Sequence, residues 1–364
     1  MNWAVDFWRT FGDGRLNVFG LVVLLGYSCL YLAGAFVSIE GVRLAEQAVF
    51  FVRYDKGVAF VGAWLLCTVW YAVARQQDAL REDRLIPMVL ALVMLGLAAL
   101  VECLVYLRMV PEVLKEGRYH DAMQNLAVVA AGSIAFLLLH WRPEASQRGK
   151  VRSKQPLHAG FEEVSARRIR NIDLFVAANL LLFSAMSLAV YRERFILYRG
   201  LENIQEFYIY ACLILCFITY LWKLFRRIDV PASILVMLQI GILMHFAGGL
   251  VFSGGERLYD CRFIGVRYDK YVHFFNAFTV SLLVVFMFRT RRLFSERCLP
   301  VVTVLTVLGL GAVVELAEYV VYCTVPRNGV GGYDNNLQDL FANLGGAVIA
   351  MLLLKHATER RASS

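Results

Sequence analysis

Three apolar segments near the C-terminal end each carry a stripe of polar side chains at helical spacing. The stripes are Asp269, His273 and Asn276 at the start of segment 271–288, Glu315, Glu318 and Tyr322 late in segment 299–323, and Gln338, Asp339, Asn343 and Gly346 in segment 338–354. Residues three, four or seven positions apart share a helical face. We therefore expect three neighbouring helices that turn polar faces toward one another.

The residue types in these stripes are those of a carboxylate and histidine metal site. The candidate ligands for a divalent cation are His245, His273, Glu315, Glu318 and Asp339. Helical bundles assemble such sites from inward-facing carboxylates and imidazoles. We assign catalytic roles to His273, Glu315, Glu318 and Asp339, with Asp269 orienting His273. Substrate-binding roles are assigned to Arg267, Lys270, Asn276, Gln338 and Asn343, with Arg267 and Lys270 attracting an anionic head group.

The same residues allow other interpretations. Without a metal they could form an acid/base site, because crowded carboxylates favour protonation and imidazole exchanges protons near neutral pH. They could also line an ion pathway. A purely structural arrangement is the simplest alternative: Lys270 or Arg267 would satisfy Glu315 and Glu318, and Asp339 would cap a helix start. Each residue taken alone fits this structural alternative. All of them are predicted at the same depth in the membrane, however, and this agreement favours a functional site.

The composition places these segments in a membrane. The chain has 364 residues, 59% hydrophobic and 18% charged, with a mean hydropathy of +0.58. A span needs roughly 20 apolar residues, and ten segments qualify. They are 17–38, 57–74, 86–108, 123–141, 172–191, 204–224, 230–252, 271–288, 299–323 and 338–354. The predicted fold is an all-α, polytopic transmembrane helical bundle.

Charge predicts the orientation. In a ten-span arrangement, 23 Lys and Arg residues lie on the side of the two termini and 14 on the opposite side, which predicts cytoplasmic termini in the inner membrane. The net charge of +8 then reflects topology, and nucleic acid is not an expected partner. Every polar stripe falls at the outer ends of its helices. Cys261 and Cys323 also fall near that face, and whether they pair stays open.

An internal repeat divides the chain. Residues 32–56 align with 246–270 without a gap, with 11 identities in 25, and Tyr119 and Gly132 match Tyr333 and Gly346 at the same offset of 214. Spans 1–4 and 7–10 are therefore interpreted as parallel copies of a four-helix unit. The first copy has lost polar residues: Ala59 matches His273, and Asn125 matches Asp339. The predicted domains are a degenerate repeat at 1–141, a basic cytoplasmic linker at 142–171 and a six-span unit at 172–364.

The motifs resemble a known family. The strings RYDKYVHFFNAF, AVVELAEYV and GYDNNLQDLFANLGGA are similar to those of the YjdF-like bacterial inner-membrane proteins and, more distantly, of VanZ-like proteins. The resemblance covers about residues 172–354. It implies that spans 5–10 are the family unit, and His245 fits the His-x-x-Gly that precedes the Tyr-Asp motif. It names no reaction.

These observations lead to three functional hypotheses. The first is an enzyme, a hydrolase or group transferase, that acts on a lipid-linked or envelope substrate, because ATP is absent from the outer face. The second is an ion-coupled transporter or solute-binding protein, against which the apolar inner halves of spans 7–10 count. The third is a non-catalytic accessory subunit of an envelope assembly.

Overall fold

The computed structural model of the chain describes residues 26–30, 32–33, 36–39, 42–46, 48–49, 52–74, 85–108, 115–140, 169–226, 228–324 and 331–363. Most of the predicted first span at 17–38 and nearly all of the predicted linker at 142–171 lie outside these described residues. Statements on those two elements therefore remain predictions.

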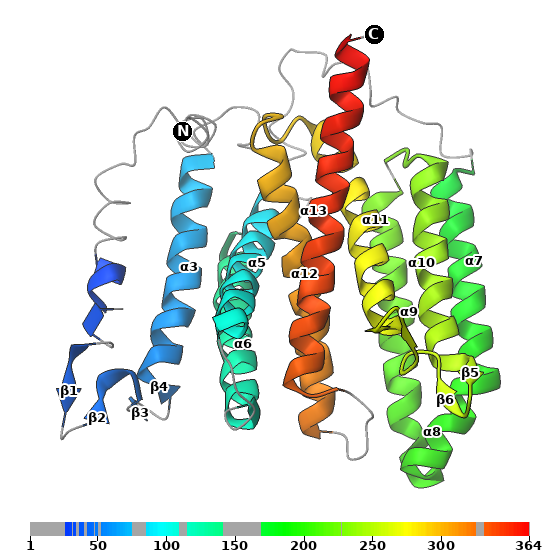
Figure 1. Cartoon of the computed structure of the whole chain (residues 1–364), viewed down its shortest axis with the longest axis horizontal. Helices are drawn as coiled ribbons and strands as arrows, with labels where there is room; N and C mark the ends of the chain where they lie inside the picture. Colours follow the sequence, from blue (N-terminus) through cyan, green and yellow to red (C-terminus); the bar gives the residue numbers. More distant parts are fainter. Residues whose placement is uncertain are drawn as a thin grey trace. The chain divides into compact units, whose positions relative to one another are not determined.

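Long helices dominate the described part of the chain (Figure 1). They are α3 (Tyr54–Ala74), α5 (Leu85–Arg108), α6 (Lys115–His140), α7 (Asn171–Met186), α9 (Ile204–Phe225), α10 (Ala232–Leu250), α11 (Tyr268–Arg291), α12 (Leu299–Thr324) and α13 (Tyr333–Ser363). Among the described residues, nine helical segments are long and apolar enough to cross a membrane. They match the nine predicted spans that follow the first one. The prediction of an all-α, multi-pass membrane protein is confirmed.

Short antiparallel hairpins precede two of these helices. The pairs β1 (Ser38–Ile39) with β2 (Val42–Arg43) and β3 (Ala48–Val49) with β4 (Val52–Arg53) come before α3. The pairs β5 (Phe252–Ser253) with β6 (Glu256–Arg257) and β7 (Arg262–Phe263) with β8 (Val266–Arg267) come before α11. The sequence pattern does not predict these hairpins, because strands of two residues leave no alternation of polar and apolar residues.

The described residues fall into two compact units. One contains the described parts of Gln147–Leu243, and the other those of Met1–Ser146 and Met244–Ser364. In the first of these, α7 continues through a π-helical turn (Ser187–Tyr191) into α8 (Arg192–Arg199), and a short 3-10 helix, η5 (Leu201–Asn203), leads to α9. Asn179 of α7 donates to Gln239 of α10 at 2.7 Å, and Trp222 of α9 donates to Asp173 of α7 at 2.7 Å. Partly buried amide and carboxylate hydrogen bonds thus join its helices.

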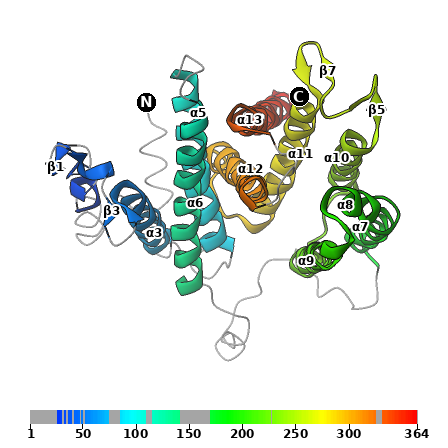
Figure 2. The same cartoon turned by 90° about the horizontal axis from the view of Figure 1, so that it is seen from below.

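The larger unit is built around the crossing of α5 and α12. Gly96 lies against the backbone oxygen of Leu305, and Gly309 lies against that of Leu92, so that a Cβ at either glycine would overlap the opposite helix. Figure 2 shows α12 beside α5 and α6, with α11 and α13 on its other side. Small residues let transmembrane helices approach this closely, which increases their van der Waals contact.

Contacts in the larger unit recur at a fixed spacing along the chain. Gly132 of α6 lies against the backbone of Phe60 in α3, and Gly346 of α13 lies against that of Phe274 in α11. Each pair is separated from its counterpart by the offset of 214 found in the sequence. The hydroxyl groups of Tyr54 and Tyr268 likewise donate to the carbonyls of Leu30 and Met244, at 2.9 and 3.2 Å. These paired contacts occur at the spacing of the predicted repeat, and the repeat itself stays a prediction.

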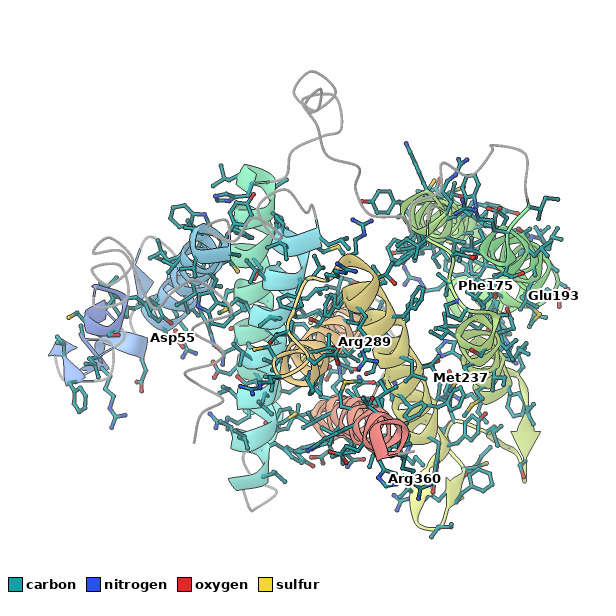
Figure 3. All side chains as sticks on the ribbon, turned by 90° about the horizontal axis from the view of Figure 1, so that it is seen from above. Asp55, Phe175, Glu193, Met237, Arg289 and Arg360 are labelled. Atoms are coloured by element: carbon teal, nitrogen blue, oxygen red, sulfur yellow. The ribbon has the colours of Figure 1, made fainter. Side chains whose placement is uncertain are left out.

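Helices α11 and α13 run in the same direction and pack along much of their length. Arg289 lies near the end of α11 and Arg360 near the end of α13 (Figure 3). The first turns of both helices therefore lie at the opposite end from these arginines, together with the last turns of α12.

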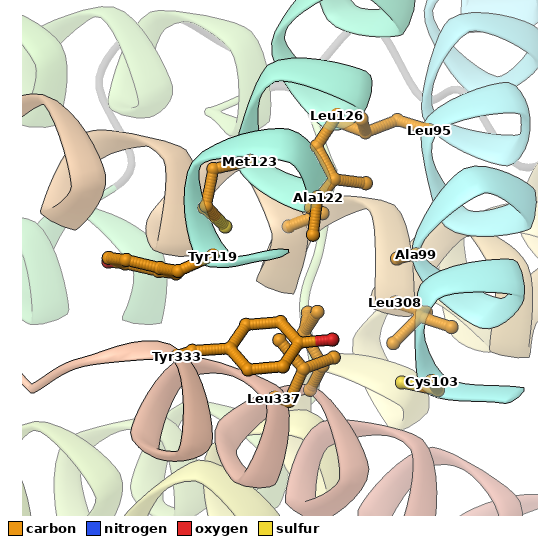
Figure 4. Close-up of a cluster of buried hydrophobic side chains, with 12 residues drawn as sticks. Leu95, Ala99, Cys103, Tyr119, Ala122, Met123, Leu126, Leu308, Tyr333 and Leu337 are labelled. Carbon is orange, nitrogen blue, oxygen red and sulfur yellow. The ribbon is translucent and has the colours of Figure 1, made fainter. Parts of the chain in front are cut away.

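A hydrophobic core joins α5, α6, α12 and α13 (Figure 4). It includes Leu95, Ala99, Cys103, Tyr119, Ala122, Met123, Leu126, Leu308, Ala312, Tyr333, Leu337 and Leu340, all buried. Tyr119 packs edge-on against Tyr319 of α12, with ring centroids 5.3 Å apart. This core holds the last turns of α12 against the first turns of α13, where the polar stripes lie.

Candidate functional site

Three of the predicted site residues meet at one point. His273 of α11, Glu315 of α12 and Asp339 of α13 each offer a ligand atom, and these atoms lie within 4.8 Å of one another. The Nδ1 atom of His273 is 3.9 Å from Oε1 of Glu315, and its Nε2 atom is 3.4 Å from Oδ1 of Asp339. One imidazole and two carboxylates from three helices thus surround a common space.

Glu315 is the least satisfied group in this cluster. Its side chain is fully buried, with 0% exposed, and neither carboxylate oxygen has a hydrogen-bond partner among the described residues. A buried carboxylate without a hydrogen bond or a counter-charge is strongly unfavourable. The arrangement is therefore incomplete unless a proton or a cation joins it.

Lys270 does not supply the missing charge to Glu315. Its Nζ atom donates to Oδ1 of Asp339 at 2.8 Å and to the side-chain and backbone oxygens of Asn335 at 2.9 and 3.0 Å. It also lies 3.2 Å from Asp269. Because an ammonium group has three donors, Lys270 is saturated by these neighbours.

Arg267 is also engaged locally. Its guanidinium group lies 3.2 Å from Asp260 and 3.4 Å from Asp269, and it donates to Asn335 at 3.1 Å. Asp269 in turn accepts the backbone N–H of Lys270 at 2.9 Å. Arg267 and Lys270, the two residues predicted to contact an anionic head group, therefore form ion pairs with neighbouring side chains of the protein. The same contacts fix Asp269 beside Lys270, and among the described residues there is no hydrogen bond in which His273 donates to Asp269.

The other predicted ligands lie outside the three-residue group. Glu318 is half-buried, one turn beyond Glu315 on α12. His245 of α10 is exposed, and its Nδ1 atom lies 2.5 Å from the hydroxyl group of Tyr259, which also contacts the backbone oxygen of His245 at 2.9 Å. His245 is therefore held by Tyr259.

The predicted amide residues differ in burial. Asn343 is buried, with its side chain against Gly311 of α12. Asn276 is half-buried, and Gln338 is exposed on α13. Cys261 and Cys323 are both free thiols, so they do not form a disulfide.

Three further polar residues were not foreseen from the sequence. Asn336 is fully buried one turn before Asp339, and both of its side-chain polar atoms lack a hydrogen-bond partner among the described residues. The buried hydroxyl groups of Tyr119 and Tyr333 also lack one. The Asn-Asn-x-x-Asp run that ends at Asp339 could have indicated a polar role for Asn336. The tyrosines gave none, because aromatic residues are common in membrane helices without any polar role.

The donor set suits a divalent cation. One imidazole nitrogen and two carboxylate oxygens are ligands that Zn²⁺, Mn²⁺ and Fe²⁺ accept, and three protein ligands leave positions for water or substrate. The cation would also neutralise Glu315. His273 and Asp339 lie in the second turns of α11 and α13, and Glu315 lies in the second half of α12, which ends at Thr324.

Comparison with known proteins identifies the family of this chain. No curated protein and no solved structure matches the chain. The model of the family described as "Predicted membrane protein (DUF2238)" matches residues 173–360, about half of the chain. The match contains His273, Glu315 and Asp339 and ends before the C-terminus. The chain therefore belongs to this family of predicted membrane proteins (DUF2238).

Proposed function

We propose that His273, Glu315 and Asp339 bind a divalent cation. The observation that carries this proposal is the fully buried Glu315 carboxylate, whose two oxygens have no hydrogen-bond partner among the described residues although a second carboxylate and an imidazole are adjacent. Cation binding would remove that unfavourable desolvation and give all three side chains a common partner.

A cation-binding measurement tests this proposal. The full chain, purified in detergent, should bind one Mn²⁺ or Zn²⁺ ion per molecule, as measured by elemental analysis after gel filtration. H273A and D339N should each weaken binding by more than about 10-fold, since even the outer partners of metal ligands contribute that much. Q338A is the matched control, because Gln338 is exposed on the same helix as Asp339. Equal binding by wild type, H273A and D339N would refute the assignment.

We further propose that the cation serves an enzyme that hydrolyses or transfers a group on a lipid-linked substrate. A cation held by His273, Glu315 and Asp339 would favour loss of a proton from a water molecule, which would attack a phosphoryl or acyl ester and break its bond to the alcohol. We assign proton acceptance to Glu318, which lies on the same stripe of α12 as Glu315 but outside the ligand group. The leaving alcohol would then take that proton. In keeping with the resemblance noted above, we infer that the family is the YjdF-like group.

Comparative lipidomics of a deletion strain tests the reaction class. Loss of the protein should cause one lipid-linked species to accumulate and another to disappear. Complementation by wild type should reverse this change, whereas complementation by H273A at equal protein level should not. An unchanged lipid profile together with altered uptake of an ion or solute would instead support a transporter.

A further inference from the structure

The larger unit contains a second buried lysine in the same setting as Lys270. Lys56 of α3 precedes Lys270 of α11 by 214 positions, and both side chains are more than nine-tenths buried. The Nζ atom of Lys56 donates to Asp121 of α6 at 2.7 Å and also to Asn125. The Nζ atom of Lys270 makes the corresponding contacts with Asn335 and Asp339 of α13.

An acid and an amide have exchanged places between these two settings. Asp121 corresponds to Asn335 and Asn125 to Asp339, each at the offset of 214. Each lysine therefore has one acid and one amide, but the acid lies one helical turn deeper beside Lys270. The side chain of Asp121 is 27% exposed, whereas that of Asp339 is 1% exposed.

The exchange decides whether the neighbouring glutamate is satisfied. Glu102 of α5 is the counterpart of Glu315, and it accepts a hydrogen bond from the Asn125 amide at 2.8 Å. At the position of Asn125, the second setting has the carboxylate of Asp339, which has no N–H to donate to Glu315. Beside Lys56, the Glu102 carboxylate is thus paired with a neutral amide. Beside Lys270, the corresponding two positions hold two adjacent carboxylates, Glu315 and Asp339.

A third difference concerns the imidazole. His273 lies three positions after Lys270 on α11, and Ala59 lies three positions after Lys56 on α3. Ala59 is half-buried and offers no ligand. The surroundings of Lys56 therefore contain a counterpart of Glu315, which is Glu102. They contain no counterpart of His273 or of the buried Asp339 carboxylate.

We propose that Lys56, Glu102, Asp121 and Asn125 form a latent second divalent-cation site, closed by the acid–amide exchange and by the absence of a histidine at position 59. The Asn125 amide donates to Glu102, whereas Asp339 and Glu315, at the corresponding positions, would share the proposed cation. The inference rests on the proposed cation site at His273. It identifies two determinants of cation binding: the imidazole of His273, and a carboxylate rather than an amide at position 339.

A gain of stoichiometry tests the inference. The variant A59H/D121N/N125D, purified as the full chain in detergent, should bind two Mn²⁺ ions per molecule, against one for wild type. A59H alone is the matched control and should stay at one, because Asn125 still occupies the position of the second carboxylate. A wild type with one ion and a triple variant with one ion, both monodisperse, would overturn the latent site and leave the proposed function intact.

The reverse exchange keeps the inference testable if the triple variant fails to fold. H273A/N335D/D339N reproduces the first setting around Lys270, with one acid, one amide and no imidazole. It should bind no Mn²⁺ and unfold at a temperature at least as high as metal-free wild type, because the new amide at 339 can donate to Glu315. Retention of one ion, or a lower unfolding temperature, would overturn the inference. Absence of Mn²⁺ from both wild type and A59H/D121N/N125D would reject the proposed function as well.

Discussion

At the residue scale, the site depends on the difference between a buried acid that has a partner and one that has none. Glu102 and Glu315 are both buried on neighbouring helices of the same unit. Glu102 accepts a hydrogen bond from Asn125, whereas neither oxygen of Glu315 has a hydrogen-bond partner in the described part of the chain. The cost of desolvation is therefore compensated at Glu102 and left uncompensated at Glu315.

Glu315→Gln should separate stability from cation binding. In EDTA the variant should unfold at a higher temperature than wild type, because a neutral amide costs less to bury than an unpaired carboxylate. In wild type, Mn²⁺ at 100 times its Kd should add about 2.7 kcal/mol of stability, and in the variant almost nothing. Scanning fluorimetry with and without Mn²⁺ measures both effects. A variant that is less stable than wild type in EDTA would mean that Glu315 has a structural partner.

The polar residues around Lys270 illustrate what a sequence can and cannot predict at this scale. The helical period placed His273, Glu315 and Asp339 on the polar faces of their helices. The structure brings these three side chains together. It could not predict that Asp260, Asp269 and Asn335 would take up the charges of Arg267 and Lys270. Those contacts depend on the hairpin and the helix start coming together in space.

At the scale of elements, the close crossing of α5 and α12 positions Glu102 and Glu315. Gly96 and Gly309 allow each helix to lie against the backbone of the other. The lack of a side chain at these two positions is what sets the distance between the helix axes.

Gly309→Val should therefore be strongly destabilising. The added side chain would overlap the backbone oxygen of Leu92, and overpacking of this kind typically costs about 1–3 kcal/mol. Gly57→Ala is the control: an added Cβ at Gly57 meets nothing within 4 Å, and the helix propensity of Ala favours it by roughly 0.5–1 kcal/mol. Thermal unfolding in detergent compares the two. Equal unfolding temperatures for both variants would contradict a close crossing.

The hairpins show a limit of local sequence information at this scale. Hydropathy located nine described helices, because a run of apolar residues is a local property. The hairpins depend instead on turns in which Gly254, Gly255, Ile264 and Gly265 adopt positive φ. Glycine adopts this conformation readily, but Ile264 does so against the usual preference of a β-branched residue. The turn was therefore not evident from the residue types.

At the scale of the whole molecule, the orientation of the chain in the membrane stays a prediction. The count of Lys and Arg on the two sides favours cytoplasmic termini. Arg289 and Arg360 follow the apolar parts of α11 and α13 at the end away from His273. This orientation would put the candidate site at the outer face.

Reporter fusions at the C-terminus test the orientation. A green fluorescent protein fused after Ser364 should fluoresce, because it folds in the cytoplasm, and an alkaline phosphatase at the same point should be inactive. A phosphatase fused within the β7–β8 turn at Gly265 should be active. The opposite pattern would move the site to the cytoplasmic face and would remove the argument against ATP as a co-substrate.

The sequence by itself determined that this is a multi-pass helical membrane protein and which helical stripes are polar. Both properties follow from the order of residues along one chain, through hydropathy and the helical period. Only the tertiary structure decided that three of the predicted ligands converge, that His245 is held by Tyr259 and that the charges of Arg267 and Lys270 are used locally. The physical reason is that a helical period gives the face and depth of a residue, whereas the rotation of each helix against its neighbours is set by packing at contacts such as Gly96 and Gly309.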